Sequence, residues 1–540
     1  MVKTFSLATE STRARVQQFI ETGSQFRLGG LPTEAPHPAA SELAELAHHD
    51  LPRAIQLFKD IEQSALEVVL TQLDAAHELT ATLRRVFQDG HRVFLCGCGA
   101  TGRLALVLES VWREQPLSGK REDVVAFTAG GDFALVRSLG IFEDRPELGA
   151  KHLLDLGFGE GDLLIAITEG GETSFVLGAL EKATQKSREK AWLLFCNPID
   201  VLVRTTDRSK VAIENPRVRP LALETGPMIL AGSTRLQASS VLMTFVGGCL
   251  RELVTGEKVE WIFSQLLDRV SQIDLGPCAR LIDLEAQAHL DSTYTLHRSR
   301  TASIGVLTDT TERAPTFSLA PFENSRDSQS ILSRTYLEVP GTRDSLSAWT
   351  QILGRAPRPF HPQRSVQSPA IDMIALLGFD FSSGAKERRA ARGAPTELTI
   401  DIEFETGILG FHYSTNSAGD ALRDYIVPTG DDLLIRQSIL KYLLNLQSTL
   451  AMGRVGRYQG NLMTFVRPAN NKLIDRALRT LRSLAARQPE SERRAQIYNW
   501  IAQEAPDEQL LAALFAAMDQ IQPDQPAVIA ALELLLANAE

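Results

Sequence analysis

The stretch Leu95-Cys96-Gly97-Cys98-Gly99-Ala100-Thr101-Gly102-Arg103-Leu104 decides the fold of this 540-residue chain. An apolar run at residues 92–96 enters a loop with three glycines, and apolar residues at helical spacing follow from Leu104 to Val111. A strand, a glycine loop and a helix start together form an anion site, because free backbone N–H groups and the positive end of the helix dipole converge there. The sequence therefore predicts that this loop holds a phosphate or a similar anion.

Short apolar runs recur beyond the glycine loop, with helix-like segments between them. They lie at residues 123–128, 162–168 and 191–196. Alternation of short apolar strands with helices is typical of a parallel sheet that helices cover on both faces. We therefore predict an α/β fold with a doubly wound parallel sheet in the first half of the chain.

A second, weaker α/β region follows helical linker sequence. Its candidate strands or helices are residues 301–308, 370–379 and 396–404. Beyond about Lys441 the chain is mostly helical and rich in Ala and Leu. The sequence predicts four parts: a helical N-terminal segment, a first α/β domain, a linker helix with a second α/β domain, and a helical C-terminal cap. Their expected bounds are residues 1–80, 81–265, 266–455 and 456–540.

The composition is that of an ordinary soluble protein, with 44% hydrophobic and 23% charged residues and a net charge of −10. The acidic balance argues against a nucleic-acid partner, which would require a basic face. No apolar stretch approaches the ~20 residues that span a bilayer, and residues 1–6 do not resemble a signal peptide. We therefore expect a cytoplasmic protein without a membrane partner. The five cysteines are odd in number and lie mostly in apolar runs, which predicts free thiols and no metal site.

The spacing Gly97-x-Gly99-x-x-Gly102 also matches the dinucleotide-binding fingerprint. That fingerprint needs an acidic residue at the end of the second strand, which here ends in Thr128-Ala129-Gly130-Gly131. Arg103 in the first helical turn favours a compact anion over a long pyrophosphate. We expect no cofactor, and the alternative to a binding loop is a glycine turn that only packs.

Two further loops place hydroxyl groups at helix starts. Thr168-Glu169-Gly170-Gly171-Glu172-Thr173-Ser174 follows one strand, and Gly232-Ser233-Thr234-Arg235 opens a later helix. Loops that follow neighbouring parallel strands converge on one crevice. We therefore expect four of these residues to contact a sugar phosphate: Thr168, Gly170, Thr173 and Ser233. The same hydroxyls also suit ordinary helix N-caps.

Several patches of sequence resemble the sugar-isomerase (SIS) domain family, in the branch that includes N-acetylmuramic acid 6-phosphate etherase and the glucokinase regulatory protein. They are Leu31-Pro32-Thr33-Glu34, residues 97–104, Ala129-Gly130-Gly131-Asp132 with Phe142-Glu143-Asp144, and Gly226-Pro227 with Gly232-Ser233-Thr234-Arg235. Gly460-Asn461-Leu462-Met463 and Asn470-Asn471-Lys472-Leu473 extend the resemblance into the expected cap.

The resemblance implies two SIS domains in tandem, each with a doubly wound parallel sheet, so that tandem domains replace homodimerisation. The second domain is degenerate, because residues 297–303 lack the glycines of a phosphate loop. The catalytic Glu that follows the loop in the etherase falls on Val111, but residues 309–317 match its segment in the second half. The resemblance therefore implies Glu143 and Glu312 as the catalytic pair, with Lys472 near the phosphate.

A hexose 6-phosphate, amino and N-acetyl sugars included, would be held by the loop residues and present its C1–C3 end to the two carboxylates. The loop residues expected to bind it are Gly99, Ala100, Thr101, Gly102 and Arg103. Two carboxylates in different environments can act as base and acid, which fits an etherase-like lyase or an aldose–ketose isomerase. The alternative is a non-catalytic sugar-phosphate sensor that regulates a sugar kinase. Glu169 and Glu172 would repel a phosphate unless they point away, or contact sugar hydroxyls or an amino group.

Overall fold

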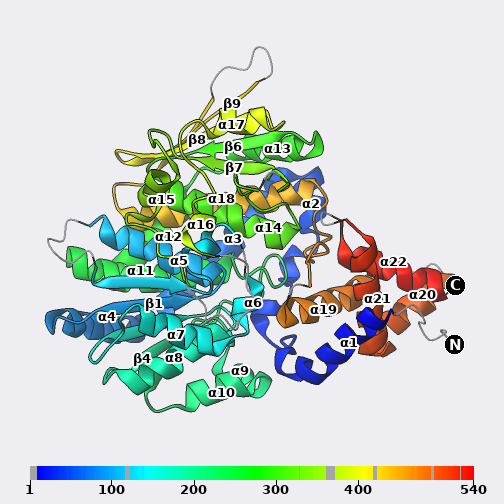
Figure 1. The fold of residues 1–540 in the computed structure, drawn as a ribbon, viewed down its shortest axis with the longest axis horizontal. Helices are drawn as coiled ribbons and strands as arrows, with labels where there is room; N and C mark the ends of the chain where they lie inside the picture. The colour runs from blue at the N-terminus through cyan, green and yellow to red at the C-terminus, as the bar shows by residue number, and fades with distance from the viewer. Residues whose placement is uncertain are drawn as a thin grey trace.

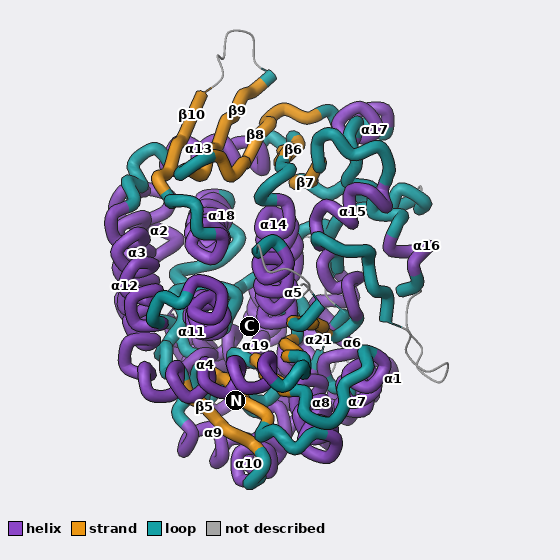
Figure 2. Tube along the Cα trace, turned by 90° about the vertical axis from the view of Figure 1, so that its left-hand side faces the viewer, coloured by secondary structure: helices purple, strands orange, loops and turns teal. Residues whose placement is uncertain are grey.

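Two five-stranded sheets lie at opposite ends of the main body, and a group of helices near both chain ends packs at its side (Figure 1 and Figure 2). This computed structural model describes residues 9–115, 122–137, 139–327, 329–360, 371–416, 423–468, 470–487, 492–522 and 525–539. Residues 1–6, which bear on the signal-peptide prediction, lie outside the described residues.

The first sheet is entirely parallel, in the order β2-β1-β3-β4-β5. Its strands are β1 (Val93–Gly97), β2 (Val124–Thr128), β3 (Leu163–Ile167), β4 (Ala191–Phe195) and β5 (Val218–Ala222). Every residue of β1 to β4 is buried, as expected for a parallel sheet that is covered on both faces. The doubly wound sheet predicted from the glycine loop is therefore confirmed.

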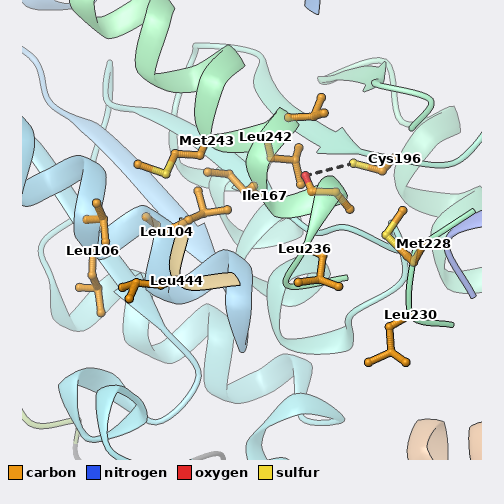
Figure 3. Packing of buried hydrophobic residues seen from close by; sticks show 14 of the residues in the cluster. Leu104, Leu106, Ile167, Cys196, Met228, Leu230, Leu236, Leu242, Met243 and Leu444 are labelled. Carbon is orange, nitrogen blue, oxygen red and sulfur yellow. Dashed lines mark hydrogen bonds between the residues drawn. The ribbon is translucent and has the colours of Figure 1, made fainter. Parts of the chain in front are cut away.

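Helices connect these strands and cover the sheet. They are α5 (Ala100–Arg113), α6 (Gly140–Glu143), α7 (Pro146–Asp155), α8 (Ser174–Lys186), α9 (Ile199–Thr205), α10 (Asp207–Glu214) and α11 (Gln237–Thr255). Helix α5 packs on β1 and β2, and α11 packs on α5. Leu104 and Leu106 of α5, Ile167 of β3 and Met243 of α11 belong to the buried core beside the glycine loop (Figure 3).

The second sheet has the order β10-β9-β8-β6-β7. Its strands are β6 (Tyr294–Arg298), β7 (Thr335–Glu338), β8 (Thr396–Glu405), β9 (Ile408–Thr415) and β10 (Arg423–Pro428). The helices before and within this unit are α12 (Val259–Gln272), α13 (Cys278–Leu290), α14 (Ser303–Phe317), α15 (Ser345–Leu353), α16 (Met373–Leu376) and α17 (Ala385–Ala391). The second α/β region expected from the sequence is therefore present.

Strand direction in the second sheet differs from the parallel arrangement that the sequence analysis expected. Strands β7, β6 and β8 are parallel, but β9 and β10 run antiparallel to their neighbours. The connection from β8 to β9 is the two residues 406 and 407, and Gly407 adopts a φ of 73°. A link this short closes a hairpin, whereas a parallel crossover needs a dozen residues or more. Of the candidate segments, 396–404 is strand β8, and most of 301–308 belongs to helix α14.

Helices from both ends of the chain complete the molecule. They are α1 (Glu10–Thr22), α2 (Leu43–His49), α3 (Leu51–Leu66), α4 (Leu73–Gln88), α18 (Leu433–Arg454), α19 (Asn471–Arg487), α20 (Glu492–Asn499), α21 (Asp507–Gln520) and α22 (Ala527–Ala539). Helix α18 packs against α2, α11, α13 and α14, so it joins the two α/β units. Helix α1 packs against α21 at the side of the molecule (Figure 1). Within the described ranges, no helix is both long and apolar enough to cross a bilayer.

Two glycines set the shape of the loop between β1 and α5. A Cβ atom on Gly102 would lie 1.9 Å from Thr128 Oγ1, and one on Gly97 would lie 2.4 Å from the backbone N of Gly102. The first turn of α5 therefore lies against the ends of β1 and β2, in contact that leaves no space for a side chain.

We expect Gly102→Ala to lower the free energy of unfolding by about 1–3 kcal/mol, because the added methyl group overpacks this contact. Thermal melting of the full chain measures the effect. Gly159→Ala is the matched control, since a Cβ on Gly159 meets no atom within 4 Å. Equal melting temperatures for the two variants would contradict the close packing.

Candidate functional site

The glycine loop leads into the amino end of α5. Gly99 occupies the N-cap position with a φ of 58°, and no side chain caps the helix. Thr101 Oγ1 donates to the Cys98 carbonyl at 3.0 Å and accepts from the Cys98 N–H at 3.1 Å. The Thr101 hydroxyl therefore shapes the loop, which leaves the N–H groups of the first turn to bind an anion.

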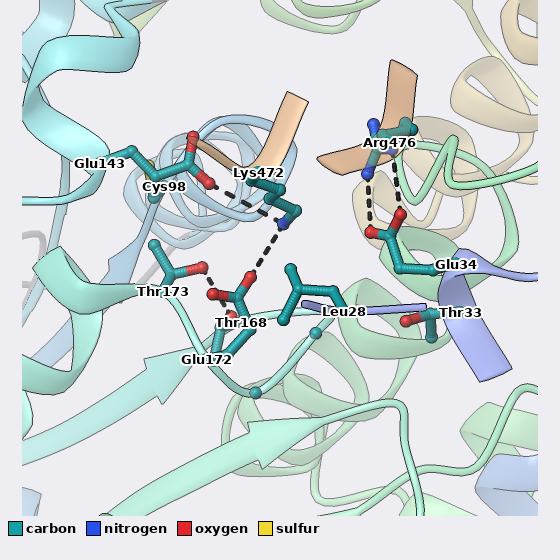
Figure 4. Close-up of polar contacts among 12 residues, drawn as sticks. Leu28, Thr33, Glu34, Cys98, Glu143, Thr168, Glu172, Thr173, Lys472 and Arg476 are labelled. Atoms are coloured by element: carbon teal, nitrogen blue, oxygen red, sulfur yellow. Dashed lines mark hydrogen bonds and ion pairs between the residues drawn. The ribbon is translucent and has the colours of Figure 1, made fainter. Parts of the chain in front are cut away.

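The loop after β3 lies beside the glycine loop, because β1 and β3 pair in parallel and both end at the same edge. Thr168 Oγ1 and Thr173 Oγ1 lie 3.0 Å apart and form a hydrogen bond (Figure 4). The Gly170 carbonyl accepts from Asn197 Nδ2 at 3.1 Å, and the same amide group donates to Thr33 Oγ1 at 3.0 Å. The predicted residues Thr168, Gly170 and Thr173 therefore belong to one rigid loop.

Lys472 of α19 reaches this loop and lies between two carboxylates. Its Nζ is 3.0 Å from Glu172 Oε1 and 3.8 Å from Glu143 Oε1 (Figure 4). Asn470 Nδ2 donates to Glu143 Oε2 at 2.9 Å, and Arg208 donates to Glu172 Oε2 at 2.6 Å. The predicted residues Glu143 and Lys472 are thus brought together, although they lie more than 300 residues apart in the sequence.

Glu312 of α14 contacts the first unit through Arg103 of α5. Arg103 Nη1 is 3.7 Å from Glu312 Oε1, and both side chains are almost fully buried. Arg103 Nε also donates to the Ala134 carbonyl at 3.0 Å. A pocket at this junction is lined by Ala100, Glu312 and Lys441, among others. The predicted catalytic carboxylates therefore contact different cations: Glu143 contacts Lys472, and Glu312 contacts Arg103.

The segment before α11 supplies two further polar groups. Ser233 is buried, and its Oγ has no hydrogen-bond partner among the described residues. Arg235 points to the second unit instead, where Nη1 donates to Asp309 Oδ1 at 3.1 Å. Ser233 was predicted to bind the ligand and Arg235 was not, and the structure places Arg235 in a buried ion pair between the two units.

Burial raises the pKa of several carboxyl groups at these contacts. It raises the pKa of Glu143 and of Glu312, although Lys472 and Arg103, respectively, partly oppose the shift. Burial, together with the negative charge of Glu143, raises the pKa of Asp144 to about 7. Glu172 differs from these groups, because Lys472 and Arg208 outweigh its burial and lower its pKa. In the described part of the chain, no group of three or more His, Cys, Asp or Glu side chains is arranged to hold a metal ion.

The sequence analysis did not identify an ion-pair cluster that fixes the cap to the N-terminal segment. Glu34 is buried and accepts from Arg476 Nη2 at 2.7 Å (Figure 4). It also accepts from Arg479 Nη2 at 2.8 Å. Glu34 belongs to a patch that carries the family resemblance, which was the available signal. Arg476 and Arg479 gave no sequence signal of a buried ion pair, because arginine on an amphipathic helix usually faces solvent.

A known family matches the part of the chain that contains β1, β2 and β3. Residues 74–184 match the family described as the glucokinase regulatory protein N-terminal SIS domain. The resemblance to SIS-domain proteins is therefore confirmed. An N-acetylmuramic acid 6-phosphate etherase from Synechococcus elongatus is 34% identical over 213 residues, which cover 39% of this chain and 64% of that protein. The etherase from Aliivibrio fischeri is 30% identical over 214 residues, which cover 39% of this chain and 66% of that protein.

Each match thus spans less than two thirds of the relative's own length. Among solved structures, the C-terminal domain of glucosamine-fructose-6-phosphate aminotransferase from Francisella tularensis matches with a TM-score of 0.36 at 10% identity. That match covers 74% of this chain and 94% of the other.

We expect Glu34→Gln to destabilise the chain at pH 7 by on the order of 3 kcal/mol. Burial alone would raise the pKa of Glu34, but Arg476 and Arg479 hold it at about 2. A lowered folded-state pKa stabilises the protein above the unfolded pKa near 4.5, and the contribution is lost as the pH falls toward 2. Melting temperatures between pH 3 and pH 7 test this. The difference from the wild type should shrink toward pH 3, while exposed Glu42→Gln shows none at any pH.

Proposed function

We propose that the chain binds a hexose 6-phosphate in a site that its two α/β units share, and acts on it by carboxylate acid–base chemistry as an etherase-like lyase. The observation that carries this proposal is the buried contact between Arg103, in the first turn after the glycine loop, and Glu312 of the second unit. The resemblance of the chain to N-acetylmuramic acid 6-phosphate etherases supports the ligand class.

The phosphate would bind at the amino end of α5, where backbone N–H groups and the helix dipole favour an anion. Lys472 would add a charge-assisted contact from the cap. The remainder of the sugar would then extend toward Glu143 and Glu312, which belong to different helices, α6 and α14.

The proposed chemistry begins with removal of the proton at C2. In the open-chain sugar this proton is acidic, because C2 adjoins the C1 carbonyl. One carboxylate takes the proton, the electron pair forms a C2–C3 double bond, and the C3 substituent leaves with a proton from the other carboxylic acid. A raised pKa suits both roles at neutral pH, because it strengthens the base and keeps the acid protonated. An isomerase would share the first step and return the proton to C1.

Proton NMR in D₂O tests the proposal with a panel of sugar 6-phosphates: glucose, glucosamine, N-acetylglucosamine and N-acetylmuramic acid. Removal of the C2 proton is read from loss of the C2 proton signal, whether by elimination or by exchange with solvent deuterium, and lyase activity from release of the C3 substituent. We expect Glu312→Gln to slow turnover by about 10²–10⁴-fold and to change the dissociation constant only a few-fold.

Exposed Glu181→Gln on α8 is the matched control and should retain full activity. Melting temperatures establish that both variants fold. Transfer of the C2 proton to C1 without loss of a C3 substituent would identify an isomerase. Binding without deuterium exchange for any sugar would identify a sensor, and absence of binding would overturn the proposal.

A further inference from the structure

Two buried carboxyl groups, Glu169 and Glu172, lie in the loop that faces the proposed phosphate site. Two negative charges there would oppose the binding of an anion. For Glu172 the structure removes this conflict, because Arg208 and Lys472 lie 2.6 and 3.0 Å from its two carboxylate oxygens. The charge of Glu172 is therefore balanced before any ligand arrives.

The carboxyl group of Glu169 has different surroundings from that of Glu172. Its side chain is only 7% exposed, and it forms no ion pair with any of the residues that the structure describes. Ser239 Oγ lies 3.3 Å from Glu169 Oε1, while the Ser239 hydroxyl donates to the Thr234 carbonyl at 2.8 Å. A buried carboxyl group without a paired cation avoids its desolvation cost by keeping its proton. Burial accordingly raises the pKa of Glu169 to about 7, with Lys472 opposing the shift and Glu312 adding to it.

Several charged or titratable groups of the proposed site interact electrostatically with Glu169. Burial, with the charges of Glu143 and Glu169, raises the pKa of the Cys98 thiol in the glycine loop. Burial lowers the pKa of Arg103, while Glu312 and Glu169 raise it. Glu169 is thus within electrostatic reach of the loop, of α14 through Glu312, and of the cap through Lys472.

We propose that Glu169 contacts the bound sugar phosphate as a neutral carboxylic acid, donating its proton in a hydrogen bond, so that binding requires this proton. This inference rests on the proposed function. It identifies Glu169 as the group whose protonation controls ligand binding in the same site. Loss of the proton removes the donor and leaves a negative charge facing an anion. Glu172 cannot do the same, because Arg208 and Lys472 keep it ionised.

Calorimetric titration with the best-binding sugar 6-phosphate of the panel tests the inference between pH 7 and pH 8.5. The phosphate is already a dianion in this range, since its second pKa is about 6. With a pKa of about 7 for Glu169, the protonated fraction falls about fifteenfold, so the dissociation constant of the wild type should rise about fifteenfold. Glu169→Gln keeps a hydrogen-bond donor without a titrating proton, and its dissociation constant should change less than twofold.

Asp144→Asn is the matched control, because Asp144 also has a pKa raised to about 7 and is influenced by the charges of Glu143 and Glu172. This variant should retain the fifteenfold dependence. The inference would be overturned if the dissociation constant of Asp144→Asn no longer depended on pH, or if that of Glu169→Gln still did.

A second measurement needs no variant. Binding heats in buffers of different ionisation enthalpy at pH 7.5 should show the wild type taking up about 0.75 of a proton, the deprotonated fraction of a group with a pKa of about 7. Binding without proton uptake would overturn this inference and leave the proposed function standing. Failure of every sugar phosphate to bind at pH 6 would overturn both.

Discussion

The buried guanidinium of Arg103 is the constraint on which the site depends. Arg103 is only 2% exposed, and burying a charged side chain is strongly unfavourable unless a partner compensates for the lost hydration. Its partners are the Ala134 carbonyl in the first unit and Glu312 in the second. Since Arg103 lies in the first turn of α5, its side chain connects the helix that follows the glycine loop to the second unit.

Further contacts repeat this connection between the two units. Thr311 Oγ1 donates to the Leu135 carbonyl, and Arg355 forms a two-pronged ion pair with Asp132 at 2.7 and 2.9 Å. The segment that follows β2 is therefore held by residues from the second half of the chain. The second unit lacks a glycine-rich phosphate loop of its own, and its observed contribution here is to position the loops of the first.

Much of the first unit could be predicted from the sequence, because its signals are local. Buried parallel strands read as continuous apolar runs, and glycines at 97, 99 and 102 mark the turn between β1 and α5. Strand β5 is absent from the predicted strands, since Arg219 and Pro220 interrupt its apolar run at the sheet edge. Strand β6 was missed because its threonine, histidine and arginine give no apolar run, although His297 is fully buried.

The sequence by itself determined the α/β class and the position of the glycine loop between β1 and α5, and the residues that it predicts for the site stay a prediction. It could not determine which charges balance one another, because ion pairs between distant segments leave no pattern along the chain. Only the tertiary structure brought Lys472 to Glu143 and Glu172, and Arg103 to Glu312. It also distinguished Glu172, whose pKa Lys472 and Arg208 lower despite its burial, from Glu169, whose pKa burial raises to about 7. Two similar acidic residues three positions apart thus differ in pKa because of the segments that pack around them.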